Sequence, residues 1–163
     1  MLQLNTEPLP KRKDAYIVGG SVRDIILNKK AKDIDIVVAN EPEKYAKELA
    51  YKIKGHLVKL GKSDNITYRV ATKDICFDIT SINGSSIKED LSKRDFTINA
   101  LALDLCENKI IDYFQGINDI KTKKVRIVSD KVFKSDPIRL LRAYRIAAVL
   151  GFTLGKKTTY FIK

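Results

Sequence analysis

The stretch KDIDIVV, residues 32–38, constrains the fold of this chain more than any other. It is short, aliphatic and rich in β-branched residues, which predicts a β-strand. Alternate side chains of a strand point to opposite faces, so Asp33 and Asp35 project together while Ile34 and Ile36 take the other face. At a rise of about 3.3 Å per residue, the two aspartate Cα atoms are roughly 6–7 Å apart. The sequence therefore predicts a strand that packs by one face and carries two carboxylates on the other.

Two carboxylates on one face suit Mg²⁺, which binds a few carboxylates together with phosphate and water oxygens. In a two-metal site, such carboxylates hold ions that activate a hydroxyl and stabilise a leaving pyrophosphate. The alternative is an exposed strand whose aspartates only keep it solvated. The stretch CFDIT adds a third carboxylate, Asp78, which is either a further metal ligand or the partner of a neighbouring Arg or Lys.

The segment before this strand favours the metal site. AYIV, residues 15–18, predicts a short buried strand that runs into Gly19-Gly20 and then into a helix. We expect Ser21 to be the N-cap of that helix. A strand, a Gly-Gly turn and a helix start together present backbone N–H groups and a positive helix end to a phosphate. Arg23 adds a guanidinium in the first turn.

The charge of the chain favours an anionic partner. Thirty-one Lys and Arg residues against 20 Asp and Glu give a net charge of +11, which is typical of proteins that bind nucleic acid, nucleotides or acidic membrane surfaces. The sequence contains no signal peptide and no transmembrane run, so we expect a cytoplasmic protein without a membrane partner. Its two cysteines are far apart and are expected to be reduced thiols.

The remaining patterns predict an α+β domain followed by helix. We expect a helix at 41–53, a strand at 56–60 and an antiparallel hairpin from 65–71 and 74–82. Short helices and strands follow to about residue 129. The last region begins with a predicted helix in which Asp136 is the N-cap and Pro137 the first residue. The sequence after this helix has no clear helix-terminating signal, so we expect the chain to be a fragment of a longer protein.

Four motifs in order resemble one family: GGSVRD (19–24), KDIDIV (32–37), KRDFTINALAL (93–103) and DPIRLLRAYRIAA (136–148). They are similar to the class II tRNA nucleotidyltransferases (CCA-adding enzymes) and the bacterial poly(A) polymerases, within the DNA polymerase β-like nucleotidyltransferase superfamily. The resemblance implies a catalytic head with a small mixed sheet flanked by helices at 1–129, and the beginning of an all-α neck at 130–163.

The resemblance also implies roles for individual residues. Asp33 and Asp35 match the catalytic pair that holds Mg²⁺, and a third carboxylate such as Asp78 is common in the superfamily. Other matched positions bind the nucleotide in the family. One group contacts the triphosphate, an Arg-Asp pair recognises the ribose, and a further group recognises the base together with two more arginines. These residues are Gly19, Gly20, Arg23, Arg94, Asp95, Asp136, Arg139, Arg142 and Arg145. The implied partners are CTP or ATP and the 3′ end of tRNA, and the implied reaction adds CMP or AMP to that end without a template.

Three departures from the family pattern leave the exact activity open. Lys93 stands where the family has an arginine, and Ser135 stands where it has a glutamate. The connection at 83–86 is short where many members have a longer mobile loop that assists A addition, so a CC-only enzyme is an alternative. The sequence is also compatible with a poly(A) polymerase, with a non-catalytic nucleotide- or RNA-binding domain, and with a chain that needs a separate helical partner or further C-terminal domains.

Overall fold

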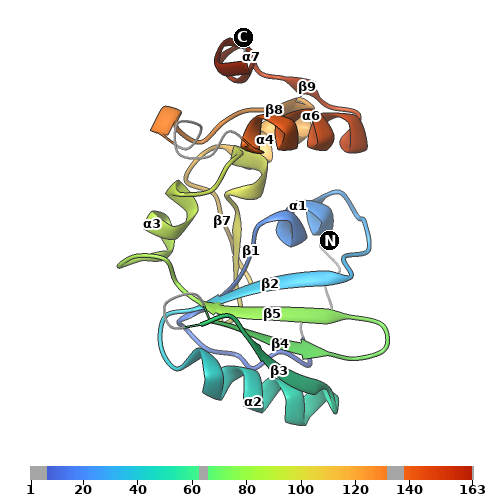
Figure 1. The fold of residues 1–163 in the computed structure, drawn as a ribbon, viewed down its shortest axis with the longest axis vertical. Helices are drawn as coiled ribbons and strands as arrows, with labels where there is room; N and C mark the ends of the chain where they lie inside the picture. Colours follow the sequence, from blue (N-terminus) through green and yellow to red (C-terminus); the bar gives the residue numbers. More distant parts are fainter. Residues whose placement is uncertain (1–6, 63–65, 132–137, 163) are drawn as a thin grey trace.

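A seven-stranded mixed sheet forms the centre of the molecule (Figure 1), as seen in a computed structural model that describes residues 7–62, 66–131 and 138–162. The strand order is β3-β4-β5-β2-β1-β6-β7. The strands are β1 (Ala15–Val18), β2 (Asp33–Val38), β3 (His56–Leu60), β4 (Thr67–Ala71), β5 (Cys76–Ser81), β6 (Ala102–Asp104) and β7 (Ile110–Ile111). The predicted small mixed sheet is therefore confirmed.

Only one neighbouring pair in this sheet, β2 and β5, is parallel. In its register Asp35 lies opposite Asp78, and Asp33 lies opposite Cys76. The predicted hairpin of β4 and β5 is antiparallel as expected and places Arg69 opposite Asp78. Three polar side chains thus lie in one row across the middle of the sheet.

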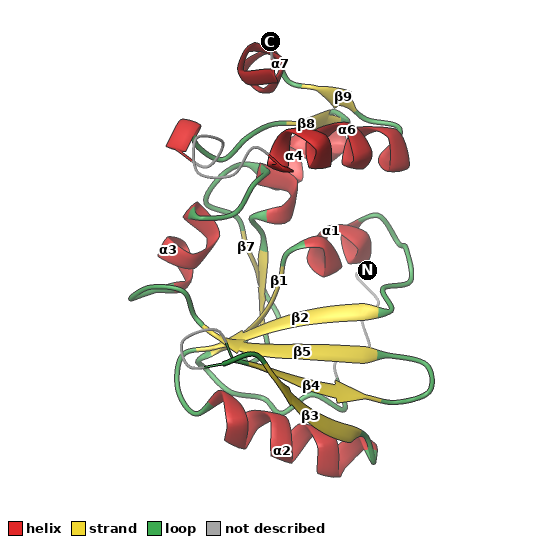
Figure 2. Ribbon diagram, in the orientation of Figure 1, coloured by secondary structure: helices red, strands yellow, loops and turns green. Residues whose placement is uncertain are grey.

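Helix α2 (Pro42–Ile53) covers the apolar face of the sheet (Figure 2). Proline occupies the first turn, where its missing N–H costs no hydrogen bond. The helix buries Tyr45, Ala46 and Leu49, and these join Ile36 of β2 in the main hydrophobic core. The alternation of Asp33 to Ile36 is realised, because the aliphatic residues are buried and the aspartates are exposed.

The opposite face is covered only in part. Helix α3 (Ile87–Ser92) sends Leu91 into a second, smaller apolar cluster with Val18 and Val37. Val37 is on the same face of β2 as the two aspartates. The side chains of Asp33 and Asp35 therefore lie next to the area that α3 covers, but they are exposed to solvent. The other short elements of this part are α1 (Gly20–Ile26), η1 (Thr97–Asn99) and α4 (Gly116–Lys121).

The last region is mostly helical, with α6 (Ile138–Leu150) and α7 (Lys156–Ile162). It also contains a feature that the sequence did not predict: β9 (Thr153–Leu154) pairs in parallel with β8 (Lys124–Val125). The expected helix start at Asp136 and Pro137 lies outside the described residues, as does Ser135. No helix in the described part of the chain is both long enough and apolar enough to cross a membrane.

Candidate active site

The turn between β1 and α1 brings the backbone close to the carboxylates. Gly19 has φ of 76°, a left-handed conformation that favours glycine. A Cβ at this position would lie 2.9 Å from Nη1 of Arg94 and 3.5 Å from Oδ2 of Asp35. Glycine is therefore required both by the turn and by the close approach of these two side chains.

Ser21 does not cap α1 as predicted, because Gly19 occupies the N-cap position. The Ser21 hydroxyl instead donates to the carbonyl of Asp33 at 3.1 Å and accepts from the N–H of Asp35 at 3.4 Å. Its side chain is buried, and it fastens the start of α1 to the strand that bears the carboxylates. The serine thus has a positioning role in place of the expected capping role.

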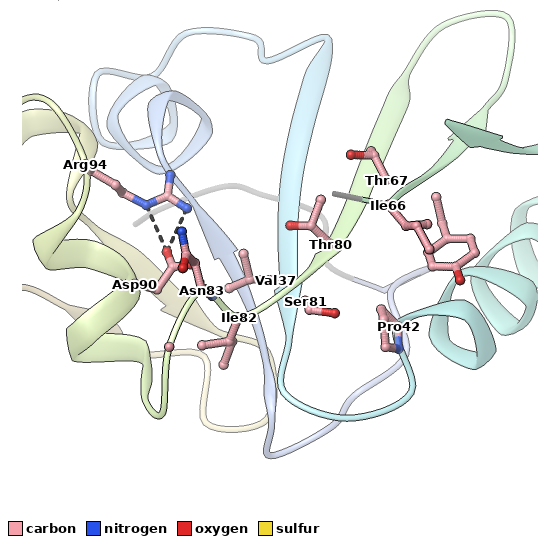
Figure 3. A pocket seen from close by; sticks show the side chains of 12 residues that line it. Val37, Pro42, Ile66, Thr67, Thr80, Ser81, Ile82, Asn83, Asp90 and Arg94 are labelled. Carbon is pink, nitrogen blue, oxygen red and sulfur yellow. Dashed lines mark hydrogen bonds and ion pairs between the residues drawn. The ribbon is translucent and has the colours of Figure 1, made fainter. Parts of the chain in front are cut away.

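Arg94 is held by a buried carboxylate, Asp90, on α3 (Figure 3). Its Nε and Nη2 donate to one oxygen of Asp90 at 3.1 and 2.9 Å. The remaining nitrogen, Nη1, is the atom nearest to Gly19. Asp90 was not among the predicted site residues, although it lies four positions before Arg94, which follows the end of α3 by two residues.

Asn99 joins two predicted site residues. Its Oδ1 accepts from Nη1 of Arg23 at 2.6 Å, and its Nδ2 donates to Oδ1 of Asp95 at 3.1 Å. The second Asp95 oxygen lies 3.0 Å from Nη2 of Arg142, which forms an ion pair with it. Asp95 and Asn99 are both buried, so the hydrogen bond between them is shielded from water, whereas Arg142 reaches Asp95 from an exposed position. Asn99 is a further residue that sequence reasoning missed.

These groups line one cleft, which we call the arginine cleft. It consists of two cavities of about 250 and 350 Å³ that share Gly20, Asp35, Asn99 and Arg142. Every predicted nucleotide-binding residue in the described part of the chain lines it. The predicted residues in its walls are Gly19, Gly20, Arg23, Asp35, Arg94, Asp95, Arg139, Arg142 and Arg145, with Lys93 and Asn99 beside them. Asp136, also predicted, lies outside the described residues.

Asp35, a carboxylate in the wall of the cleft, is in an environment that disfavours its charged form. Its desolvation by the surrounding protein raises its pKa above the ordinary value, although the side chain is still accessible from the cleft. Arg94 opposes this shift, whereas the negative charges of Asp78 and Asp33 add to it. A cation placed among these groups would relieve the repulsion between them.

Asp78 lies beside Asp35 and also has a cationic partner. Arg69 binds it through two hydrogen bonds of 2.7 Å, one to each carboxylate oxygen. The predicted alternative of a neighbouring Arg is therefore realised, and this contact raises the pKa of Arg69. Among the described residues no group of three or more His, Cys, Asp or Glu side chains is arranged to hold a metal. The oxygen donors of the candidate metal site are thus Asp33 and Asp35, with Asp78 paired next to them.

Comparison with known proteins assigns the family. Residues 15–126 match the model of the poly(A) polymerase head domain. The chain belongs to this family. The match spans β1 to β8 and includes the Gly-Gly turn, the carboxylate strand and the Arg94-Asp95 pair of the cleft. It confirms the family resemblance of the first three motifs, and the fourth, at 136–148, lies beyond the matched residues.

Individual relatives of the poly(A) polymerase head family are also similar. An A-adding tRNA nucleotidyltransferase of Aquifex aeolicus is 39% identical over 91% of this chain and 20% of its own length. A CC-adding tRNA nucleotidyltransferase of Halalkalibacterium halodurans is 38% identical over 92% of this chain and 38% of its own. The chain thus spans less than half the length of these curated relatives.

Solved structures give the same fold. A tRNA-processing enzyme with CTP superposes with a TM-score of 0.84 at 38% identity, covering 91% of this chain and 42% of the other. A tRNA nucleotidyltransferase complexed with a primer tRNA and an incoming ATP analog gives a TM-score of 0.82 at 37% identity, covering 91% and 45%.

Proposed function

We propose that this chain is the catalytic head of a template-independent RNA nucleotidyltransferase that adds CMP, AMP or both to the 3′ end of tRNA. The observation that carries the proposal is the arginine cleft, in which five arginines and a lysine line the same two cavities as Asp35. In the reaction, a bond forms between the RNA O3′ and the α-phosphorus of CTP or ATP. The bond from that phosphorus to the bridging oxygen breaks, and pyrophosphate leaves. The site residues, the Mg²⁺ and a cytoplasmic location all belong to this proposal.

The residues present fit Mg²⁺. Asp33 and Asp35 offer hard oxygen donors from one face of β2, and the crowded negative charge around Asp35 favours a divalent cation. When bound, the metal ions supply activation of the attacking hydroxyl and neutralisation of the triphosphate. Asp78 is proposed as a third contributor, in competition with its pairing to Arg69.

The protein's own groups bind and orient the nucleotide. Arg23, Arg94 and Arg142 present guanidinium groups to the triphosphate from three separate elements. Gly19 and Gly20 let these phosphates approach the backbone closely. The buried Asp95–Asn99 pair is proposed to lie under the ribose, and Arg139 with Asp136 is proposed to read the base edge.

The short connection between β5 and α3 supports a CC-only enzyme as the second candidate. The N–H of Asn83 donates to Asp90 at 2.9 Å, and Nζ of Lys93 donates to the carbonyl of Asn83 at 2.9 Å. Lys93, one of the departures from the family pattern, therefore fixes this connection. The connection is both short and tied to α3, which disfavours the movement that A addition is expected to need. Poly(A) addition, a non-catalytic binding role and a helical partner are alternatives that the following experiment separates.

The test is incorporation of one labelled nucleotide at a time, with Mg²⁺, into tRNAs that end at the discriminator base, at C or at CC. We expect incorporation of CMP into the tRNAs that end at the discriminator base or at C. AMP should be added to the tRNA that ends at CC only if the CC-only alternative is wrong. Asp33→Ala and Asp35→Ala should abolish incorporation, whereas Asp74→Ala, in an exposed turn of the same sheet, should not. Long homopolymer tails would favour a poly(A) polymerase. A chain that binds neither CTP nor ATP and incorporates neither would contradict the proposal.

A further inference from the structure

Strand β3 is the outermost strand of the sheet, and its outer side pairs with no strand in the described part of the chain (Figure 1). Its inner side pairs with β4 over five residues, from His56 opposite Ala71 to Leu60 opposite Thr67. In an antiparallel ladder the main-chain groups of alternate residues point to opposite sides, so roughly half of those of β3 point outward. Such a row of N–H and C=O groups can pair with another extended chain.

The two edges of the sheet differ in length. Strand β7, at the other edge, has only two residues, Ile110 and Ile111, and a short edge strand offers little to a partner. Strand β3 has five residues, which at about 3.4 Å per residue give an edge roughly 17 Å long. It contains no proline, and all of its residues except the half-buried Leu57 are exposed. This edge is therefore long enough to pair with a strand of ordinary length.

The side chains of β3 form two different surfaces. Lys59 lies opposite Tyr68, whose hydroxyl donates to Glu43 of α2 at 3.2 Å, so Lys59 is on the face of the sheet that α2 covers. Its neighbours Val58 and Leu60 point to the other, open face. Val58 is 48% exposed there, which is high for a valine in a sheet. The edge thus presents a cation toward one face and apolar groups toward the other.

The charge around β3 favours an acidic ligand. Residues 52–62 contain four lysines and no Asp or Glu. Lys52 pairs with Glu48 of α2 at 3.2 Å, whereas Lys54, Lys59 and Lys62 form no ion pair with any carboxylate that the structure describes. Lysines on an edge strand repel an identical edge, so pairing of β3 with a second copy of this chain is disfavoured. The same lysines attract an extended segment that carries negative charge.

We propose that β3 binds an extended acidic segment of a partner protein as an additional strand of the sheet. The segment alternates acidic and apolar residues, with its acids beside Lys59 and its apolar side chains beside Val58 and Leu60. Residues directly opposite on neighbouring strands share a face, so this alternation forms pairs of opposite charge and pairs of apolar groups. The added strand lies four strand spacings from β2, roughly 19 Å at about 4.8 Å each, and leaves the arginine cleft accessible.

The first test is an NMR titration of the ¹⁵N-labelled chain with the peptide acetyl-Glu-Val-Glu-Val-Glu-Val-Glu-amide. We expect shifts of the amide signals of Val58, Lys59 and Leu60. Hydrogen exchange should also slow at alternate amides of β3, because the outward N–H groups gain acceptors. The matched peptide with lysine in place of each glutamate should not bind. The proposal is overturned if the acidic peptide at millimolar concentration leaves these signals unchanged, if the lysine peptide binds equally well, or if exchange does not slow.

The second test reverses one charge of the edge. Lys59→Glu should weaken binding of the acidic peptide about fivefold or more, since an attractive cross-strand pair becomes a repulsive one. Lys121→Glu, the same change at an exposed position on α4, is the matched control and should bind the peptide like the wild type. Thermal unfolding checks that both variants fold. Equal peptide affinity in the two folded variants would reject the charge selection by β3 and with it the proposal.

Two measurements on the wild type separate other occupants of this edge. Sedimentation without peptide, together with hydrogen exchange, detects a dimer that protects the β3 amides. Such a dimer would assign the edge to a second copy and overturn the proposal. A titration with an oligouridylate tests the lysines as a nucleic-acid surface. Stronger binding of this RNA than of the acidic peptide at the β3 amides would also overturn the proposal.

Discussion

Asp90 holds Arg94 through a single carboxylate oxygen, Oδ2, which accepts from Nε at 3.1 Å and from Nη2 at 2.9 Å. The other oxygen accepts the N–H of Asn83 at 2.9 Å. One buried side chain therefore orients both a guanidinium of the arginine cleft and the connection that follows β5. The direction in which Arg94 Nη1 points, toward Gly19, depends on this contact.

Asp90→Asn should weaken CTP binding about tenfold, because an amide retains the volume but loses the charge that fixes Arg94. The free energy of unfolding should fall by about 1–3 kcal/mol, since asparagine keeps one acceptor oxygen and either Arg94 or the N–H of Asn83 then faces its NH2 group without an acceptor. Isothermal titration with CTP and Mg²⁺ and thermal unfolding measure the two effects. Glu48→Gln, which breaks an exposed ion pair with Lys52 on α2, is the control and should leave both unchanged. Wild-type CTP affinity in Asp90→Asn would contradict the positioning role.

Asn99→Ala should remove the side chain that connects Arg23 to Asp95. Both residues then lose a hydrogen bond in a water-shielded position, so we expect a loss of about 1–3 kcal/mol in unfolding free energy and a several-fold weaker CTP affinity. Asn118→Ala, an exposed asparagine on α4, serves as the control. Equal effects of the two alanine variants on CTP binding would show that Asn99 does not organise the cleft.

Asp35→Asn should raise the thermal stability of the metal-free chain at neutral pH. The pKa of Asp35 is raised in the folded protein, so the native state binds this proton more tightly than the unfolded state. The contribution of Asp35 to the free energy of unfolding therefore falls as the pH rises from the ordinary carboxyl pKa through the raised pKa. Above the raised pKa, the ionised side chain destabilises the folded state. The asparagine removes this penalty, and its advantage should vanish under acid conditions where Asp35 is protonated in both states.

Mg²⁺ provides the complementary measurement on the same variant. It should raise the unfolding temperature of the wild type and of the exposed-turn control Asp74→Asn, but not that of Asp35→Asn. If Mg²⁺ stabilises Asp35→Asn as much as the wild type, then Asp35 is not a ligand of the metal.

Glu89→Gln should release the connection between β5 and α3 and remove its pH dependence. Bonds from the N–H of Ser85, from Lys93 and from the Ser85 hydroxyl lower the pKa of Glu89 from 4.5 to about 2. A lowered pKa means that these bonds persist above the ordinary value and are lost as pH falls through about 2. The Ser85 amide signal should titrate there in the wild type and show no transition in the variant. A midpoint near 4.5 would mean that the contacts are not maintained in solution.

Local periodicity was sufficient to predict the elements that carry the chemistry. The alternation around Asp33 and Asp35 predicted β2 and its open face, and the helical pattern at 41–53 predicted α2 within one residue. The nucleotide-binding residues that line the cleft were predicted from the resemblance of the four motifs to a known family. Local periodicity alone predicted only the strand, the Gly-Gly turn and the helices that carry them.

Contacts between distant residues could not be predicted in this way. Ser21 was expected to cap its own helix, but it bonds to Asp33 twelve residues away. Asn99 is an uncharged residue within a motif, and only the fold shows that Arg23, 76 residues earlier, reaches it. Strand β9 has two residues, too few for a pattern, and exists because β8 offers it a partner.

The pairing of β8 with β9 has a consequence for the autonomy of the head. The family match ends at residue 126, yet the last strand within it completes its hydrogen bonds with Thr153 and Leu154. The hydroxyl of Thr158 adds a bond to the carbonyl of Val125 and accepts one from the N–H of Ile127. A piece that stops at residue 126 would leave these groups of β8 without their partners. The hydrogen bonds of β8 thus tie the matched residues to the helical region that follows them.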